Sequence, residues 1–137
     1  MNLIAAIEPI INDQNALFWE GAANDRLVLP WCCSSEQFFW PPGPVSPFDL
    51  KASVVWKEAP RKGTLVAAVI YRRSYLKEFE TIMPYAIGVL ALDCGPRIQV
   101  HLRELELAQQ TRPRSALYFD SLLPGGRPIP MARREPV

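Results

Sequence analysis

The segment "PWCCSSEQFFWPPGPVSPFD", from Pro30 to Asp49, decides how the N-terminal part of the chain folds. Its spacing is that of a metal ribbon with two knuckles. Cys32 and Ser35 stand in a C-x-x-C relation, and Ser46 and Asp49 repeat that relation after ten intervening residues. Tetrahedral zinc takes four thiolate or imidazole donors from two such knuckles. Because only Cys32 is a thiolate donor here, we expect a ribbon without zinc.

Large apolar side chains around the knuckles offer another way to hold such a ribbon. Burying each of them, at about 1.5–3 kcal/mol, could offset the free energy of a lost metal site. The same side chains could instead form an exposed surface that docks a partner. Both interpretations apply to the same five residues, which are Phe18, Trp19, Phe38, Phe39 and Trp40.

The composition of the chain is that of one ordinary globular unit, with 137 residues, 49% of them hydrophobic and 21% charged. A net charge of +1 argues against a protein that works on phosphate backbones, because such proteins carry a large positive excess. The opening "MNLIAAIEPII" contains Glu8 and Pro9 and lacks a basic start. We therefore expect neither a signal peptide nor a membrane anchor, a cytoplasmic location, and reduced cysteines.

Short β-rich segments separated by turns predict a mainly β fold. We expect an N-terminal helix capped by Asp13 and ending near Asn24, then a zinc-ribbon-like hairpin with a degenerate metal site, then a five-stranded OB-fold barrel. An immunoglobulin-like sandwich would need about seven strands and more residues. We divide the chain into residues 1–50, the helix and metal-free ribbon, and residues 51–137, the barrel. The strand "SVVWKEA", residues 53–59, falls in the second part.

No motif of a catalytic site occurs in the sequence. It lacks a nucleophile elbow, a phosphate-binding loop, a dinucleotide glycine fingerprint and an HExxH pair. The single histidine, His101, lies in a predicted strand, where a structural role is the commoner one. Cys32 or Cys33 would need a base close by to act as a nucleophile, and none is near in sequence. We therefore predict no catalytic residue.

Taken in order, the motifs resemble a known family of small proteins that join a rubredoxin-like zinc ribbon to an OB-fold. "FWEG…RLVLPWC…QFFWPPGPV" is similar to the N-terminal signature of that family, with Phe18 and Trp19 as the opening aromatic pair and Cys32 as the first zinc ligand. Gly63-Thr64 match the start of a barrel strand, and "PYAIGVLALDCGPRIQVHL" resembles the central barrel hairpin. The resemblance covers nearly the whole chain.

Members of this family form complexes with thiolase-like or other acyl-CoA-processing enzymes. The resemblance therefore implies a non-catalytic accessory subunit that binds a thiolase-fold or related acyl-CoA enzyme, such as an aldolase, acyltransferase or hydratase, and helps position the coenzyme A thioester. The chemistry would lie in the partner, so we expect no cofactor in this chain. Ser35, Ser46 and Asp49 replace three of the family's four cysteines, so we expect no zinc either.

Basic and aromatic residues meet in the segment "YRRSY", an arrangement that suits a ligand with both phosphates and rings. Tyr71, Arg72 and Arg73 are therefore the candidate residues for binding coenzyme A. The same arrangement would suit single-stranded nucleic acid on an OB face, which is the alternative function. The small net charge favours the acyl-CoA interpretation. A third hypothesis is a free-standing carrier of acyl-CoA.

Overall fold

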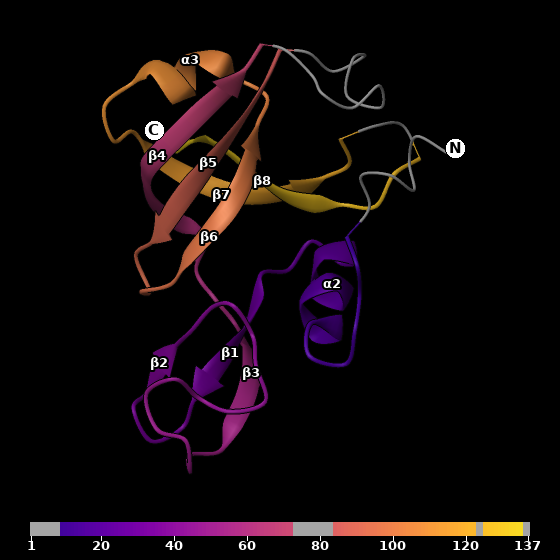
Figure 1. Ribbon diagram of the computed structural model, residues 1–137, viewed down its shortest axis with the longest axis vertical. Coiled ribbons are helices and arrows are strands. Elements are labelled where there is room, and N and C mark those ends of the chain that lie inside the picture. The colour runs from indigo at the N-terminus through magenta and orange to yellow at the C-terminus, as the bar shows by residue number, and fades with distance from the viewer. Residues whose placement is uncertain (1–8, 73–83, 123–124, 136–137) are drawn as a thin grey trace.

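The computed structural model describes residues 9–72, 84–122 and 125–135 (Figure 1). In this part of the chain a helix and a three-stranded sheet precede a closed five-stranded barrel, which confirms the predicted fold class. The elements are α2 (Ala16–Ala23), β1 (Val28–Cys32), β2 (Gln37–Phe38), β3 (Val54–Glu58), β4 (Lys62–Tyr71), β5 (Tyr85–Leu92), β6 (Arg97–Leu102), α3 (Leu105–Gln109), β7 (Arg114–Asp120) and β8 (Ile129–Arg134).

The barrel has the strand arrangement of an OB-fold. Its order is β4-β5-β6-β8-β7, and β7 closes it by pairing with β4. Neighbouring strands are antiparallel except for β6 and β8, which run parallel, and α3 connects β6 to β7. The long strand β4 pairs with β5 along most of its length and with β7 at its start, and a register shift between Leu65 and Ala67 interrupts the β5 ladder. Such a bulge bends a strand so that it can serve two neighbours.

The N-terminal sheet contains one strand more than the predicted hairpin. Its order is β2-β1-β3, with Trp31 paired to Phe38 on one side and to Val55 on the other. Residues 54–58, which we assigned to the barrel part, therefore pair with β1. The β-branched and aromatic side chains of this segment predict a strand but do not determine which strand it joins. The division of the chain at residue 50 remains a prediction.

Helix α2 is short and begins later than the sequence suggested. The residue before its first turn is Asn15, not Asp13, and the helix ends before Asn24. The Asn12 side chain accepts the backbone N–H groups of Gln14 and Asn15, which makes a turn of the segment that we predicted as the first helical turn. No helix in the described ranges is long and apolar enough to cross a membrane.

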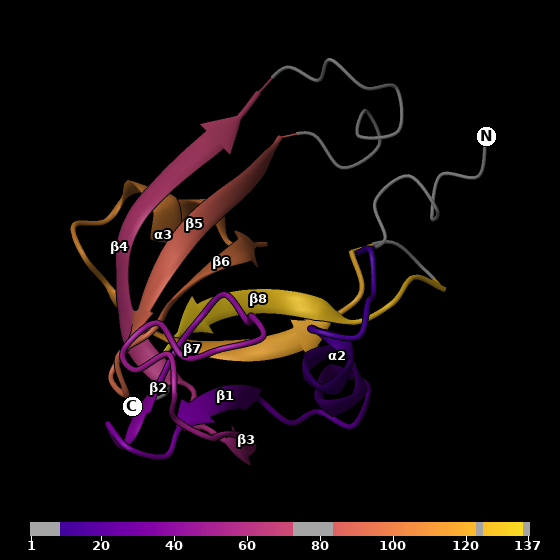
Figure 2. The same ribbon diagram turned by 60° about the horizontal axis from the view of Figure 1, so that its bottom comes forward.

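One hydrophobic core connects the helix, the ribbon and the barrel. Phe18, Leu27 and Leu29 from the N-terminal part are fully buried in the same cluster as Leu90 and Leu117 of the barrel. Figure 2 shows α2 beside the ends of β7 and β8, where the ring of Phe18 lies 5.8 Å from that of Phe119. The helix therefore covers one end of the barrel with the side chain of Phe18, which belongs to the hydrophobic core.

Candidate functional site

A pocket of about 310 Å³ lies where helix, ribbon and barrel meet. Its aromatic wall is formed by Trp19 of α2 and by Trp40, which follows β2. Ile129 of β8 adds an apolar wall. Gln99 and His101 of β6 supply its polar groups. Side chains at positions 98, 100 and 102 of β6 are buried in the barrel, so the alternation of the strand directs 99 and 101 outward. The pocket therefore lies on the outer surface of the barrel.

Three of the five aromatic residues singled out from the sequence meet at this pocket. The ring of Phe18 lies 4.5 Å from that of Trp40 and 4.8 Å from that of Trp19, and both tryptophans remain partly exposed. The other two lie in the ribbon. Phe38 packs edge-on against Trp31 at 4.8 Å, and the buried Phe39 lies 6.5 Å from Phe48.

The exposure of the five aromatic side chains decides which of them a partner could contact. Phe18 and Phe39 are 0% and 4% exposed, so their side chains lie below the surface that a partner would meet. Trp19, Phe38 and Trp40 have exposed parts and remain candidates for docking.

His101 lies between the pocket and a neighbouring aromatic ring. It stacks on Tyr85 of β5 with 6.5 Å between ring centroids, and burial lowers the pKa of its imidazole. The ring is therefore neutral near pH 7. Its Nδ1 is buried and has no hydrogen-bond partner among the described residues. Among the described residues that line this pocket, none carries a carboxylate or a thiol.

A second pocket, of about 220 Å³, continues the first across the barrel surface. Gln99 lines both, and the second is walled by Val69, Tyr71 and Ile87 from β4 and β5. Val69 and Tyr71 are 56% and 40% exposed and lie in the last part of β4, where it pairs with β5 and no longer with β7. We call the two pockets together the outer groove. Among the residues that the structure describes, no charged side chain lines either of them.

The three residues proposed for coenzyme A have different positions relative to this groove. Tyr71 lies in its wall and stacks on Tyr85 with 5.0 Å between centroids and 15° between planes. Arg72 follows at the end of β4 and is exposed. Arg73 lies outside the described residues.

The four knuckle positions also come together, and they share hydrogen bonds. Cys32 and Ser46 are both 0% exposed. A hydrogen bond from the Ser46 hydroxyl is the largest of the effects that lower the pKa of Cys32 to about 6, while burial opposes it. Ser34 and Ser35 also contribute to this lowering. Although the thiol is acidic, its burial keeps it from acting on a substrate.

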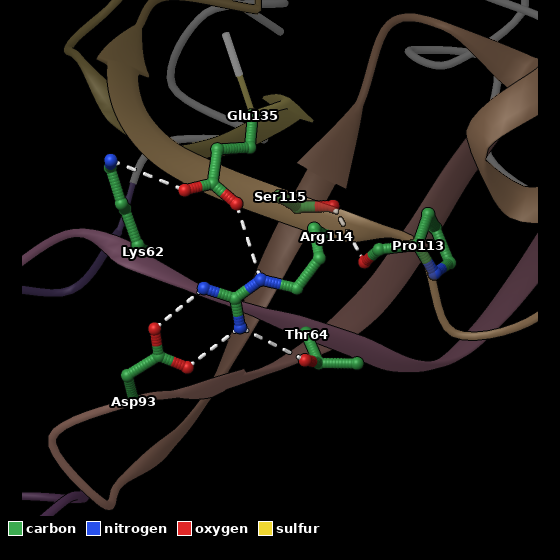
Figure 3. A network of polar contacts seen from close by, with 7 residues as sticks. All are labelled: Lys62, Thr64, Asp93, Pro113, Arg114, Ser115 and Glu135. Atoms are coloured by element: carbon green, nitrogen blue, oxygen red, sulfur yellow. Dashed lines mark hydrogen bonds and ion pairs between the residues drawn. The ribbon is translucent and has the colours of Figure 1, made fainter. Parts of the chain in front are cut away.

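At the opposite end of β4 from Tyr71, charged residues from four segments form a network (Figure 3). Arg114 at the start of β7 contacts Asp93 in the β5–β6 turn, Glu135 after β8 and the hydroxyl of Thr64 on β4. Lys62 adds a second cation, 3.2 Å from Glu135. The Arg114 guanidinium holds the pKa of Asp93 below its usual range. Because the network joins the strands that close the barrel, we interpret it as structural.

The helix, the three-stranded sheet and the closed barrel define a protein of the OB-fold class. Residues 56–111 match the family model described as "ChsH2, C-terminal OB-fold domain". This region of the chain is therefore similar to ChsH2 C-terminal OB-fold domains, which confirms the barrel part of the resemblance drawn from the sequence.

Two known proteins extend the comparison beyond that region. A "Probable enoyl-CoA hydratase alpha subunit" from Thermomonospora curvata is 31% identical over 96 residues, which are 69% of this chain but 29% of the relative. The chain thus matches less than a third of that protein's length. In the solved "Ltp2-ChsH2(DUF35) aldolase", one chain is 25% identical with a TM-score of 0.79. That alignment covers 93% of this chain and 98% of the other.

Proposed function

We propose that the protein is a non-catalytic accessory subunit, which binds a thiolase-fold aldolase or a related acyl-CoA enzyme and helps position the coenzyme A thioester. The observation that carries the proposal is the similarity to a chain of the Ltp2-ChsH2(DUF35) aldolase. It includes ribbon and barrel together and covers nearly all of both chains. The relative named as an enoyl-CoA hydratase subunit also supports a role beside an enzyme that acts on acyl-CoA.

The surroundings of the candidate nucleophiles and bases support a role in binding rather than in chemistry. Cys32 is fully buried, and burial raises the pKa of Cys94. His101 borders the outer groove, and the described lining residues include no second acid or base beside it. A general acid or base needs a proton donor or acceptor within hydrogen-bonding reach of its substrate, often with a third group to orient it. The partner would supply that machinery.

The outer groove is the surface that we assign to the complex. Its apolar and aromatic walls suit the uncharged pantetheine arm or the apolar surface of the partner. Among the described residues, a cation for phosphates lies just beyond the groove, where the exposed Arg72 follows Tyr71. Single-stranded nucleic acid would need cations along the groove itself, and the described lining residues of the two pockets include none. The groove thus favours the accessory-subunit function over the nucleic-acid alternative.

The test is co-purification with a candidate thiolase-fold aldolase from the same organism, followed by measurement of the mass of the complex in solution. We expect a stable complex at low micromolar concentration that survives moderate salt. Gln99→Arg places a charged side chain where the two pockets join, and it should weaken the complex or its affinity for an acyl-CoA at least tenfold. Gln110→Arg makes the same change at an exposed site after α3, outside the groove lining, and should bind as wild type does.

Two results would contradict the proposal. One is failure to form a complex with any thiolase-fold or hydratase-like enzyme while a labelled oligothymidine binds in a salt-sensitive way. The other is turnover of an acyl-CoA by this chain alone. Equal effects of Gln99→Arg and Gln110→Arg would leave the subunit role intact but remove the outer groove from the interface.

A further inference from the structure

The two turns of the ribbon are joined by polar contacts in the place where a zinc ribbon has its metal. The first turn contains Cys32 and Ser34, and the second contains Ser46 and Asp49. The Ser34 hydroxyl lies 3.5 Å from the sulfur of Cys32 and donates a hydrogen bond of 2.9 Å to Asp49 Oδ2. One side chain of the first turn therefore links the thiol to the second turn.

Ser46 is the buried hydroxyl of the second turn, and its surroundings leave its proton available to Cys32. Its Oγ accepts the backbone N–H groups of Phe48 at 3.1 Å and of Asp49 at 3.3 Å. Because a serine oxygen has two acceptor sites and one proton, these two bonds leave the O–H to donate to Cys32. Donation from Ser46 is the main cause that lowers the pKa of the Cys32 thiol. Both groups are fully buried, so water does not compete with the contact.

These residues do not fit a zinc ion. A structural zinc site is closed by four thiolate or imidazole donors. Here one thiol faces serine hydroxyls, and a single carboxylate is already bound to Ser34. Within the described residues, no group of three or more His, Cys, Asp or Glu side chains is arranged to hold a metal ion.

We propose that the hydrogen-bonded cluster of Cys32, Ser34, Ser46 and Asp49 replaces zinc as the cross-link between the two turns of the ribbon. The ribbon is then stable without metal. The turns also keep a geometry in which positions 32, 35, 46 and 49 surround one point. This inference concerns the chain by itself and does not depend on the proposed partner.

The first experiment compares the purified protein before and after treatment with EDTA. We expect no stoichiometric zinc by elemental analysis and the same urea midpoint in both samples. One zinc per chain, with a lower midpoint after chelation, would overturn the proposal.

The second experiment tests whether the cluster holds the ribbon. Ser46→Ala removes the buried hydroxyl that Cys32, Phe48 and Asp49 share, and should raise the equilibrium constant for unfolding roughly tenfold or more. Ser53→Ala is the matched control, because Ser53 is an exposed serine of the same ribbon. Its midpoint should stay close to that of wild type. Equal midpoints for the two variants would show that the cluster is not a cross-link.

The third experiment tests the retained geometry by rebuilding the metal site. The changes Ser35→Cys, Ser46→Cys and Asp49→Cys are combined with Cys33→Ser, which removes an exposed competing thiol. With Co²⁺ as the probe, we expect one ion per chain and the absorption of tetrahedral thiolate coordination.

The matched control for this experiment carries Ser34→Cys in place of Ser35→Cys and leaves Ser35 unchanged. It has the same number of thiols without the knuckle spacing, and should bind Co²⁺ at least tenfold more weakly. Equal affinity of the two variants, or no cobalt bound by the rebuilt site, would show that the four positions no longer converge.

Discussion

Arg114 and Asp93 form a two-point ion pair that ties the start of β7 to the turn between β5 and β6. The two terminal nitrogens of the guanidinium donate to the two carboxylate oxygens at 2.8 and 2.6 Å (Figure 3). Each terminal nitrogen thus has its own carboxylate oxygen, and this geometry is open to arginine but not to lysine.

This pair predicts part of the acid sensitivity of the fold. Because Arg114 lowers the pKa of Asp93, the carboxylate stabilises the folded state fully above about pH 4, and this contribution is lost as pH falls through the lowered pKa. In Asp93→Asn, the urea midpoint followed by circular dichroism should therefore fall less steeply than in wild type between about pH 5 and pH 2. Asp13→Asn removes an exposed carboxylate outside the network and should keep the wild-type slope. Parallel slopes for Asp93→Asn and wild type would count against the pair.

Phe18 should dominate the stability of the helix and the barrel end together. It is fully buried and touches Trp19, Trp40 and Phe119, so Phe18→Ala leaves a cavity and should lower the free energy of unfolding by about 3–5 kcal/mol. The neighbouring Leu17 is 46% exposed. Leu17→Ala should therefore change the free energy by less than about 1 kcal/mol. Equilibrium unfolding in urea measures both, and similar losses would contradict the assignment of Phe18 as the core residue of α2.

Gly63 permits the close approach of β4 and β5. A Cβ at this position would lie 2.3 Å from the carbonyl oxygen of Ala91, a distance that only backbone movement can relieve. We expect Gly63→Ala to destabilise the protein by at least about 1–3 kcal/mol. At Gly43 an added Cβ would lie 3.9 Å from the nearest atom, the carbonyl oxygen of Val45, so Gly43→Ala should be tolerated. Thermal denaturation compares the two, and a Gly63→Ala protein as stable as wild type would show that the strands can separate without cost.

The single histidine gives the fold a second pH dependence. Burial lowers the pKa of His101, which means that the folded state disfavours the charged ring. The folded protein should therefore be most stable above about pH 6.5 and lose stability as pH falls through the lowered pKa. An NMR titration of the imidazole should give a midpoint below 6.5. His101→Gln should make the urea midpoint less sensitive to pH between about pH 7.5 and 5. A titration midpoint at or above the ordinary value would contradict the burial of the ring.

The sequence allowed the fold class to be predicted because its evidence is local. Alternating apolar residues, the turn at Cys94-Gly95-Pro96 and the length of the segment 62–71 each mark a barrel element without knowledge of its neighbours. The partner of β3 is not local information. Val54–Glu58 has the composition of a strand in either part of the chain, and only tertiary packing places it against β1.

The same limit applies to the candidate site, because single large aromatic residues can be recognised in a sequence but their tertiary neighbours cannot. Phe18, Trp19 and Trp40 stood out as large aromatic residues and do meet at one pocket. Gln99, which joins the two pockets, carries no signal in the sequence beyond its outward position in a strand. The contacts of Arg114 likewise come from segments 21 to 50 residues away in sequence, so no local spacing indicates them.

The shared core has a consequence for how the chain can be divided. Phe18, Leu27 and Leu29 pack with barrel residues, and β3 completes the ribbon sheet just before the barrel begins at Lys62. A fragment that ends at residue 50 would leave an edge of β1 unpaired, and one that begins at residue 51 would open the barrel core to water. We therefore expect the ribbon and the barrel to unfold in a single cooperative transition. The smallest fragment that folds is then the whole ribbon–barrel body, and neither part should be obtained in folded form by itself.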